Sequence, residues 1–295
     1  MEQKLEHAAR VQGLVFCGLA ACTSVVSWWL PRLTLHVELA LVVGLIVLVG
    51  VPHGAVDPAY LPSSPQTVPW RAWAAFAARY VGLAAAVLAL WLVWPAGGLG
   101  AFLVMSAFHF SGDPARGATV ATRALQGIAV IALPTLWYSV ETEAALAYLA
   151  GGAAAAWCQS VVQPLALPLA FGLGVAALCE LGRGRVLVAA EAGATALVAI
   201  AAPPLVSFTV YFCAMHSARH LLRTADRARV SWPRLVLLAS APMIGTIAAG
   251  LVAWRMMAHL PIDALAIRVV FIGLAALTVP HMAIVERERF TRLAG

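Results

Sequence analysis

Long apolar segments separated by short polar breaks dominate the hydrophobic pattern of this chain. A helix needs about 20 mostly apolar residues to cross the hydrocarbon core of a bilayer. Segments close to this length recur along almost the whole sequence, and the breaks between them are rich in Pro, Gly or charged residues. The candidate spans are 11–30, 35–53, 72–94, 98–112, 119–139, 164–181, 186–202, 204–223, 234–255 and 263–285. The pattern predicts an all-α protein, a polytopic transmembrane bundle of about 8–10 spans.

The same pattern leaves no hydrophilic stretch long enough for a separate soluble domain. We expect a cytoplasmic tail at 1–10, a single transmembrane domain at 11–285 and a basic cytoplasmic tail at 286–295. The apolar piece at about 144–160 is short and contains two adjacent glycines, so it either crosses the membrane or lies at its interface. If it does not cross, nearly every basic loop falls on one side. The positive-inside rule then places both termini in the cytoplasm.

Composition identifies lipid as the solvent of this chain. Hydrophobic residues make up 62% of the sequence and charged residues 11%, against about 45–50% and 25% in soluble domains. The net charge of +6 is modest, and no Lys/Arg run is long enough to indicate a nucleic-acid partner. The five cysteines are scattered and match no zinc spacing or disulfide framework. These features predict a multi-pass protein of the cell (cytoplasmic) membrane.

Histidine, unlike the other ionisable residues, recurs inside or at the ends of the apolar segments. Ionisable side chains at membrane depth are costly and mark functional sites. Five of the eight histidines lie in such settings, and the topology above places all five near the cytoplasmic ends of their helices: His53, His109, His216, His220 and His281. Segments far apart in the sequence therefore share one depth and one leaflet, as a single metal site requires.

Two spacings strengthen the metal interpretation. His216 and His220 are four residues apart, so on a helix both rings project from one face. His53 and His109 each begin an H-x-x-x-D pattern, which ends at Asp57 or Asp113. A metal-binding histidine usually donates its other ring N–H to a carboxylate or carbonyl group. The two aspartates are candidates for that role.

Several of these residues also have simpler interpretations. A lone membrane histidine often only hydrogen-bonds a neighbouring helix, and this role competes most strongly with a metal-related one for His281. Either aspartate could instead pair with Arg219 or lie in an ordinary loop. At the level of function, a His/Asp cluster could also relay protons or metal ions in a transporter.

The motifs PHGAVD, FHFSGD, YFCAMHSARHLLR and TVPHM resemble, in order and approximate spacing, those of the Brp/Blh family of membrane β-carotene dioxygenases. The resemblance runs from about residue 45 to about residue 290, and its most specific blocks are HSARH and PHG-x-x-D. It implies that the transmembrane domain is catalytic. The implied reaction is cleavage of the central double bond of β-carotene with O2 to give two retinal molecules, with non-haem Fe(II) as cofactor.

The same resemblance assigns roles to individual residues. It implies metal binding by His53, His109, His216 and His220. From the residues themselves we expect a role around the metal or substrate for Asp57, Asp113, Arg219 and His281. The expected partners are a carotenoid, O2 and the lipid bilayer, with a functional link to a retinal-binding rhodopsin. A non-catalytic carotenoid- or retinal-binding membrane protein is the nearest alternative, although the presence of all four histidines argues against it.

Overall fold

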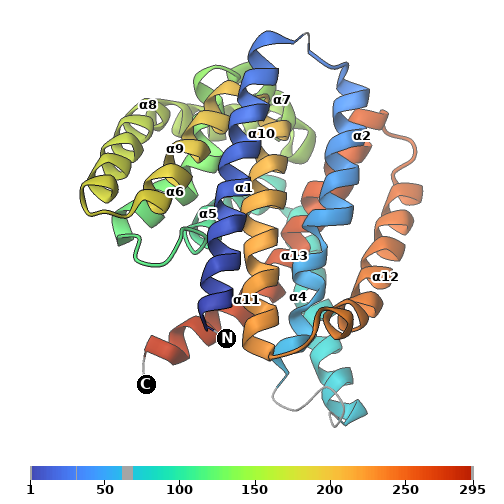
Figure 1. Ribbon diagram of the computed structural model, residues 1–295. Helices are drawn as coiled ribbons and strands as arrows, with labels where there is room; N and C mark the ends of the chain where they lie inside the picture. The colour runs from blue at the N-terminus through green and yellow to red at the C-terminus, as the bar shows by residue number, and fades with distance from the viewer. Residues whose placement is uncertain (1, 31, 62–68, 294–295) are drawn as a thin grey trace.

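The protein is a bundle of helices (Figure 1). The computed structural model describes residues 2–30, 32–61 and 69–293; helices account for 88% of the structure, and the described residues contain no strand. The predicted all-α class is therefore confirmed. The α-helices are α1 (Glu2–Trp29), α2 (Leu35–Leu45), α3 (Pro52–Ala55), α4 (Trp70–Val93), α5 (Pro95–Phe110), α6 (Val120–Ala132), α7 (Ser139–Ala150), α8 (Gly152–Gly182), α9 (Val186–Ala201), α10 (Pro204–Val210), α11 (Ala218–Ala228), α12 (Trp232–Met256) and α13 (Ile262–Leu293).

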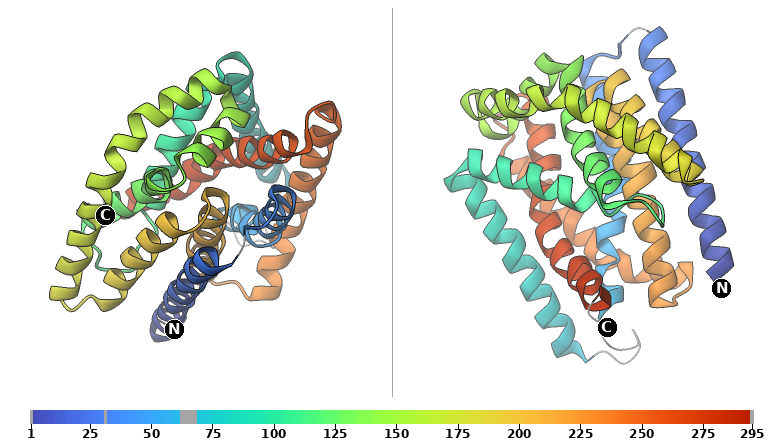
Figure 2. Two further views of the ribbon diagram at one scale, coloured as in Figure 1. Left: turned by 90° about the horizontal axis from the view of Figure 1, so that it is seen from above. Right: turned by 90° about the vertical axis from the view of Figure 1, so that its left-hand side faces the viewer.

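Four shorter segments with a different helical pitch connect or interrupt these helices. Two are π-helical, η1 (Ile46–Gly50) and η4 (Tyr211–Ser217), and two are 3₁₀-helical, η2 (Asp57–Tyr60) and η3 (Leu133–Leu136). Segments α2, η1 and α3 follow one another with almost no break, as do α10, η4 and α11. The second of these composite helices runs through the middle of the bundle. It contacts α1, α9 and the composite helix that begins with α2 (Figures 1 and 2).

Six helices among the described residues are long and apolar enough to cross a membrane: Glu6–Trp29, Leu35–Tyr60, Trp70–Val93, Gly152–Gly182, Trp232–Met256 and Ile262–Val285. A seventh is added if the pair Val120–Leu136 and Ser139–Ala150, bent by 112°, counts as one span. The sequence pattern leads us to expect about eight to ten. The difference arises partly because α5 and α9 are apolar but have only 16 residues each. At 1.5 Å per residue, such a helix is about 24 Å long, shorter than a bilayer core.

The outward faces of the long helices are apolar, as lipid requires. Leu48, Leu92 and Phe171 are 75%, 84% and 75% exposed. A water-soluble protein rarely leaves such residues in contiguous exposed patches. These faces and the six apolar helices indicate a multi-pass membrane protein.

The helix boundaries differ from the expected ones at three places. Helix α1 begins at Glu2 and so includes residues 2–10 of the expected tail, and α13 continues through the expected C-terminal tail to Leu293. The segment at 144–160 is divided by Gly151, whose φ of 87° ends α7. From Gly152, α8 continues for 31 residues through Pro164 and Pro168.

One close helix contact fixes the end of α5, where His109 lies. A Cβ atom at Gly127 on α6 would clash with the backbone of Ala107 and Ser111. Glycine therefore lets α6 approach the last turn of α5 more closely than any other residue would allow.

Candidate metal centre

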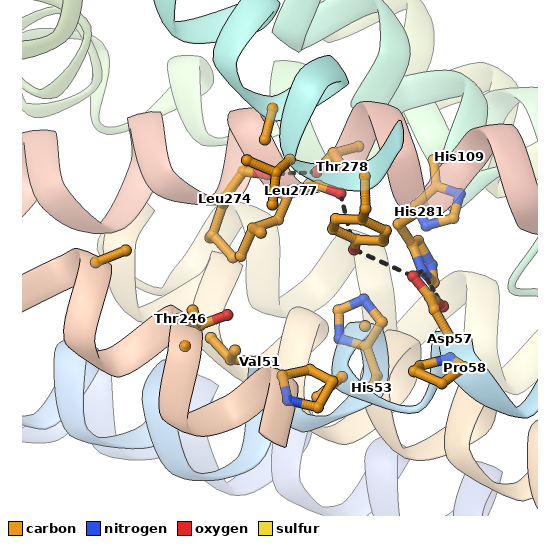
Figure 3. A pocket seen from close by; sticks show the side chains of 18 of the residues that line it. Val51, His53, Asp57, Pro58, His109, Thr246, Leu274, Leu277, Thr278 and His281 are labelled. Atoms are coloured by element: carbon orange, nitrogen blue, oxygen red, sulfur yellow. Dashed lines mark hydrogen bonds and ion pairs between the residues drawn. The ribbon is translucent and has the colours of Figure 1, made fainter. Parts of the chain in front are cut away.

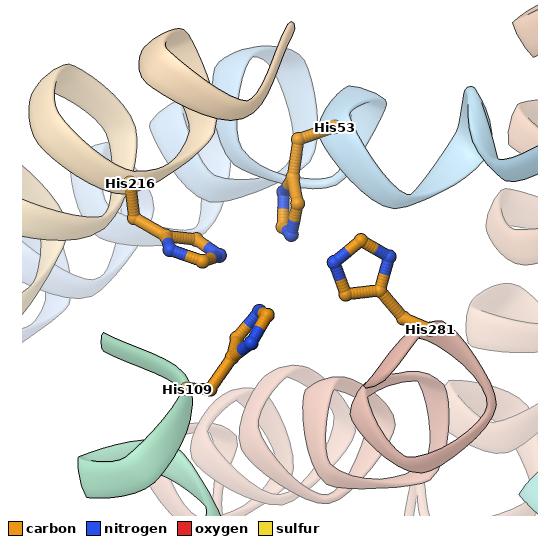
Figure 4. A group of neighbouring side chains, drawn as sticks. All are labelled: His53, His109, His216 and His281. Atoms are coloured by element: carbon orange, nitrogen blue, oxygen red, sulfur yellow. The ribbon is translucent and has the colours of Figure 1, made fainter. Parts of the chain in front are cut away.

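Four buried histidines from four separate segments converge on one point between the helices (Figure 4). They are His53 on α3, His109 on α5, His216 in η4 and His281 on α13, with exposed fractions of 7%, 8%, 2% and 3%. Each offers one ring nitrogen, and these four nitrogens all lie within 4.8 Å of one another. We call these four residues the histidine cluster.

The outer ring nitrogens of three cluster members are held by oxygen acceptors. Nδ1 of His53 lies 2.5 Å from the Gly50 carbonyl oxygen. Nδ1 of His216 lies 3.0 Å from the Asp113 carboxylate, and Nδ1 of His281 lies 2.8 Å from the Asp57 carboxylate. An acceptor at Nδ1 places the proton there and leaves Nε2 as a free electron-pair donor. Nε2 of His216 and of His281 are buried without a hydrogen-bond partner among the described residues, as are both ring nitrogens of His109.

Two π-helical segments bring His53 and His216 together. η1 ends at Gly50, just before α3, and η4 contains His216. The Ser217 hydroxyl ties the two segments together by donating to the carbonyl oxygens of Val49 and Gly50, at 2.6 and 3.0 Å. A Cβ atom at Gly50 would lie 2.5 Å from the Phe212 ring, so glycine permits this contact. Single π turns within α-helices often occur at functional sites.

Each aspartate supports a histidine of another segment rather than the histidine of its own motif. Asp57 receives hydrogen bonds from His281 and from the Tyr80 hydroxyl, the latter at 3.1 Å. We call these three residues the Asp57 unit. Asp113 receives hydrogen bonds from His216 and from the Tyr211 hydroxyl, the latter at 3.0 Å.

Asp113, His216 and Tyr211 form the Asp113 unit, which lies in the protein interior. Asp113 and Tyr211 are 4% and 1% exposed. Burial raises the pKa of the Asp113 carboxyl above its ordinary value. The hydrogen bonds from His216 and Tyr211 stabilise the carboxylate against this effect.

Arg219 holds the backbone, not the carboxylate, of Asp113. Its guanidinium donates to the Asp113 carbonyl oxygen at 2.8 Å and to the Gln12 side-chain oxygen at 2.7 Å. It also makes a two-pronged ion pair with Glu191 of α9, at 2.6 and 3.0 Å. Glu191 in turn accepts the Ala115 N–H at 3.0 Å. The loop that carries Asp113 is thereby fixed to α1, α9 and α11.

His220 lies beside the cluster, in an overlapping group with Asp57 and His281. Its ring centroid is 4.8 Å from that of His281 and 5.6 Å from that of His53. Its Nε2 lies 3.2 Å from the Thr224 hydroxyl. The structure therefore brings His281, which the sequence assigns to the surroundings, into the group of four, and it places His220 next to that group.

An apolar cavity of about 630 Å³ begins at the histidine cluster and extends between α4, α12 and α13 (Figure 3). All four cluster histidines line it, as do Asp57 and Tyr80. On α4 its wall extends from Trp73 to Leu88, a rise of about 22 Å at 1.5 Å per residue. Ligand cavities typically measure about 300–1,000 Å³ and are mostly apolar with a few polar groups. This first cavity is suited to a long apolar molecule.

Sequence reasoning missed four residues that support the cluster: Gln12, Tyr80, Glu191 and Tyr211. Glu191 could have been found from the sequence, because a carboxylate inside an apolar segment is costly and requires a partner. Tyr80 and Tyr211 could not, since tyrosine near span ends is ordinary in membrane proteins.

Comparison with known proteins agrees with this geometry. Residues 44–287 match the sequence model of the β-carotene 15,15′-dioxygenase family. This chain belongs to that family. A β-carotene 15,15′-dioxygenase from an uncultured marine bacterium (66A03) is 28% identical over 257 residues, which cover 82% of this chain and 90% of the relative. No solved structure matches.

The family match includes all eight residues that the sequence assigns to the site. It begins within α2 and ends within α13, so the whole cluster and both aspartates lie inside it. Helix α1 lies outside it, although Gln12 reaches Arg219 from there. The resemblance to membrane β-carotene dioxygenases is therefore confirmed.

Proposed function

We propose that this protein cleaves the central double bond of β-carotene with O2 and releases two retinal molecules, using Fe(II) held by the histidine cluster. The observation that carries the proposal is the meeting of four buried ring nitrogens at the wall of a long apolar cavity. Membership of the dioxygenase family and the name of the bacterial relative support the reaction and the substrate. Retinal made in this way would supply a retinal-binding partner such as a rhodopsin.

The donor set fits a divalent transition metal. Imidazole suits iron, zinc, copper and nickel, and three of the four rings have an oxygen acceptor at the outer nitrogen, as metal-binding histidines usually do. The geometry favours His53, His109, His216 and His281 as the ligands. His220, the fourth ligand expected from the family resemblance, is close enough to His281 to join or replace it. When bound, Fe(II) supplies the redox chemistry that lets O2 react with a hydrocarbon.

The residues of the chain bind and orient the substrate and keep water out. The first cavity holds one half of the polyene along α4, which puts the central bond next to the histidines where the cavity begins; productive contact requires reacting atoms about 3–3.5 Å apart. Asp57 and Asp113 fix the rings of His281 and His216 and hold the protons on Nδ1. The apolar walls exclude water from the reacting atoms. No residue is required as a general acid or base.

Expression in β-carotene-producing bacteria tests the proposal. Cells that carry the chain should lose yellow colour and accumulate retinal, whereas cells that carry His109→Ala at a matched membrane level should keep their β-carotene. Co-purification of intact β-carotene without retinal would instead favour the non-catalytic binding protein. An unchanged carotenoid pool with no bound pigment would reject both the dioxygenase and the binding protein, and would favour a transporter.

A further inference from the structure

The first cavity has an open side, whereas a second cavity of about 110 Å³, between α5, α7, α8, α10 and α13, has none. None of the described residues that line the second cavity is exposed. Among the residues that line the first cavity, every exposed one lies on α4 or α12. A residue that both lines a cavity and lies at the surface marks the rim of that cavity. The first cavity therefore opens to the outside between α4 and α12.

The rim residues repeat every four positions on each helix, so each set lies along one side of its helix. They include Ala77, Val81 and Ala85 on α4, and Ala241, Gly245 and Ala249 on α12. Within the described part of the chain, the two helices do not pack along each other: α4 packs against α13 and α5, and α12 packs against α13, α3 and η2. The space between the two rows of rim residues is the opening of the cavity.

The opening lies in the middle of two membrane-spanning helices. Helices α4 and α12 are both long and apolar enough to span a bilayer, and both run from the lower to the upper end of the bundle in Figure 1. Val81 and Gly245 are each about 16 Å along the helix from its nearer end, at 1.5 Å per residue. The neighbouring surface is apolar, with Val81 and Ile244 65% and 68% exposed. The opening therefore faces the hydrocarbon core of the bilayer and not the water on either side.

The inner end of the same cavity is polar. His109, His216 and His281 line it there, and each has a buried ring nitrogen without a hydrogen-bond partner among the described residues. An apolar path thus leads from the lipid to the histidine cluster. We propose that the carotenoid enters sideways from the lipid between α4 and α12, and that small side chains at Gly245 and Ala85 keep this opening passable. The identity of the substrate rests on the proposed function, but the position of the opening does not.

The test narrows the opening from either side and measures how fast β-carotene enters. A Cβ atom at Gly245 would meet no atom within 4 Å, so a larger side chain fits there without displacing the fold. Purified full-length protein is mixed with β-carotene in detergent micelles without O2, and the pigment that stays with the protein is followed over time. Gly245→Trp and Ala85→Trp should each slow association by roughly 10-fold, as an added barrier of about 1.4 kcal/mol does. Release into empty micelles should slow equally, because the obstacle lies on the path and not at the bound position.

Gly82→Trp and Ala86→Trp are the matched controls. Both positions are exposed on α4, beside rim residues, but neither lines the cavity. A Cβ atom at Gly82, as at Gly245, would meet no atom within 4 Å. We expect both control variants to take up and release β-carotene at the wild-type rates. The two test variants lie on different helices, so a folding defect in one leaves the other as the test.

The outcomes separate this inference from the proposed function. Unchanged association in the Gly245 and Ala85 variants, or an equal delay in the controls, would overturn the inference. Weaker retention with faster release would place the two positions against the bound substrate instead of on its path, and would overturn it as well. If the wild-type protein takes up β-carotene and the test variants delay this uptake, but no retinal forms when O2 is admitted, the opening stands and the proposed function fails. If the wild-type protein takes up no β-carotene, both fail.

Discussion

The Asp57 unit and the Asp113 unit have the same chemical composition but different surroundings. In each, an aspartate accepts hydrogen bonds from a tyrosine hydroxyl and from Nδ1 of a cluster histidine. All three residues of the Asp57 unit line the first cavity, whereas only the histidine of the Asp113 unit does. The Asp113 loop is also held by a buried Arg219–Glu191 ion pair. One unit therefore faces the first cavity, and the other anchors the histidine cluster to the bundle.

The largest expected effect is the loss of iron and activity when the histidine of either unit is removed. It tests whether the histidine of each unit binds the metal. We expect His216→Ala and His281→Ala each to abolish retinal formation and to remove most of the bound iron, because one of four nitrogen donors is lost. The measurements are iron content and retinal yield at matched protein levels. His259→Ala, at an exposed position, is the control and should behave as wild type.

His220→Ala decides the ligand set. The family resemblance predicts the same complete loss as for His216→Ala, whereas the geometry predicts that iron is retained in part. Full iron content in the His281→Ala protein together with none in the His220→Ala protein would return His220 to the set in place of His281.

The next prediction distinguishes the two units by how much each contributes to protein stability. Glu191→Gln leaves Arg219 buried without its charged partner, and such a loss destabilises a protein by about 3–5 kcal/mol. We expect a clear fall in the thermal unfolding temperature, because this ion pair joins α9 and α11 to the Asp113 loop. Tyr80→Phe, in the Asp57 unit, serves as the comparison and should unfold close to the wild-type temperature. Equal unfolding temperatures for the Glu191→Gln and wild-type proteins would show that the ion pair does not anchor the loop.

Replacing each aspartate has a smaller effect on the metal. Asp57→Asn and Asp113→Asn keep a side-chain oxygen that accepts the hydrogen bond of the histidine, but they remove the negative charge of the carboxylate. Such a change typically costs about 10- to 100-fold in metal affinity or activity. Excess iron should restore part of the activity of both variants. We expect Asp57→Asn to alter KM for the carotenoid as well, because Asp57 lines the cavity and Asp113 does not. The same KM in both variants would contradict the proposed division of roles.

The smallest effect concerns the two tyrosines. Tyr80→Phe and Tyr211→Phe each remove one hydrogen bond to a carboxylate that keeps its charge and its histidine donor, so each should cost less than the about 10- to 100-fold of the matching aspartate change. Tyr80→Phe should act mainly on carotenoid cleavage and Tyr211→Phe mainly on iron retention. Steady-state kinetics and iron release in the presence of a chelator measure the two. If Tyr80→Phe instead acted mainly on iron retention and Tyr211→Phe mainly on cleavage, the different burial of the two units would not explain their roles.

Much of this arrangement could be predicted from the sequence. Apolar segments of span length indicate the all-α class, and histidines within them are conspicuous because ionisable residues are costly there. The partners of the aspartates could not be predicted. The H-x-x-x-D spacing associates Asp57 with His53, but Asp57 contacts His281, which is 224 residues away. Only the packing of α13 against α4 and α3 brings that pair together.

A spacing rule also could not show that His281, and not His220, belongs to the group of four histidines. Positions four apart share one face only in a regular α-helix, and His216 lies in a π-helical segment that ends one residue later. The irregular turn changes the angle between the two rings. The sequence shows no proline or glycine in 211–217 to indicate it.

The two π-helical turns imply that chain length, and not only residue type, encodes the direction of these rings. In a regular α-helix each residue adds about 100° of rotation, so deleting one residue before His53 or His216 would swing that ring away from its neighbours while the histidine itself stayed in the sequence. Such a deletion would change hydropathy and composition by a single residue. For engineers who shorten or graft these helices, the spacing from η1 to His53 and through η4 must be copied residue for residue.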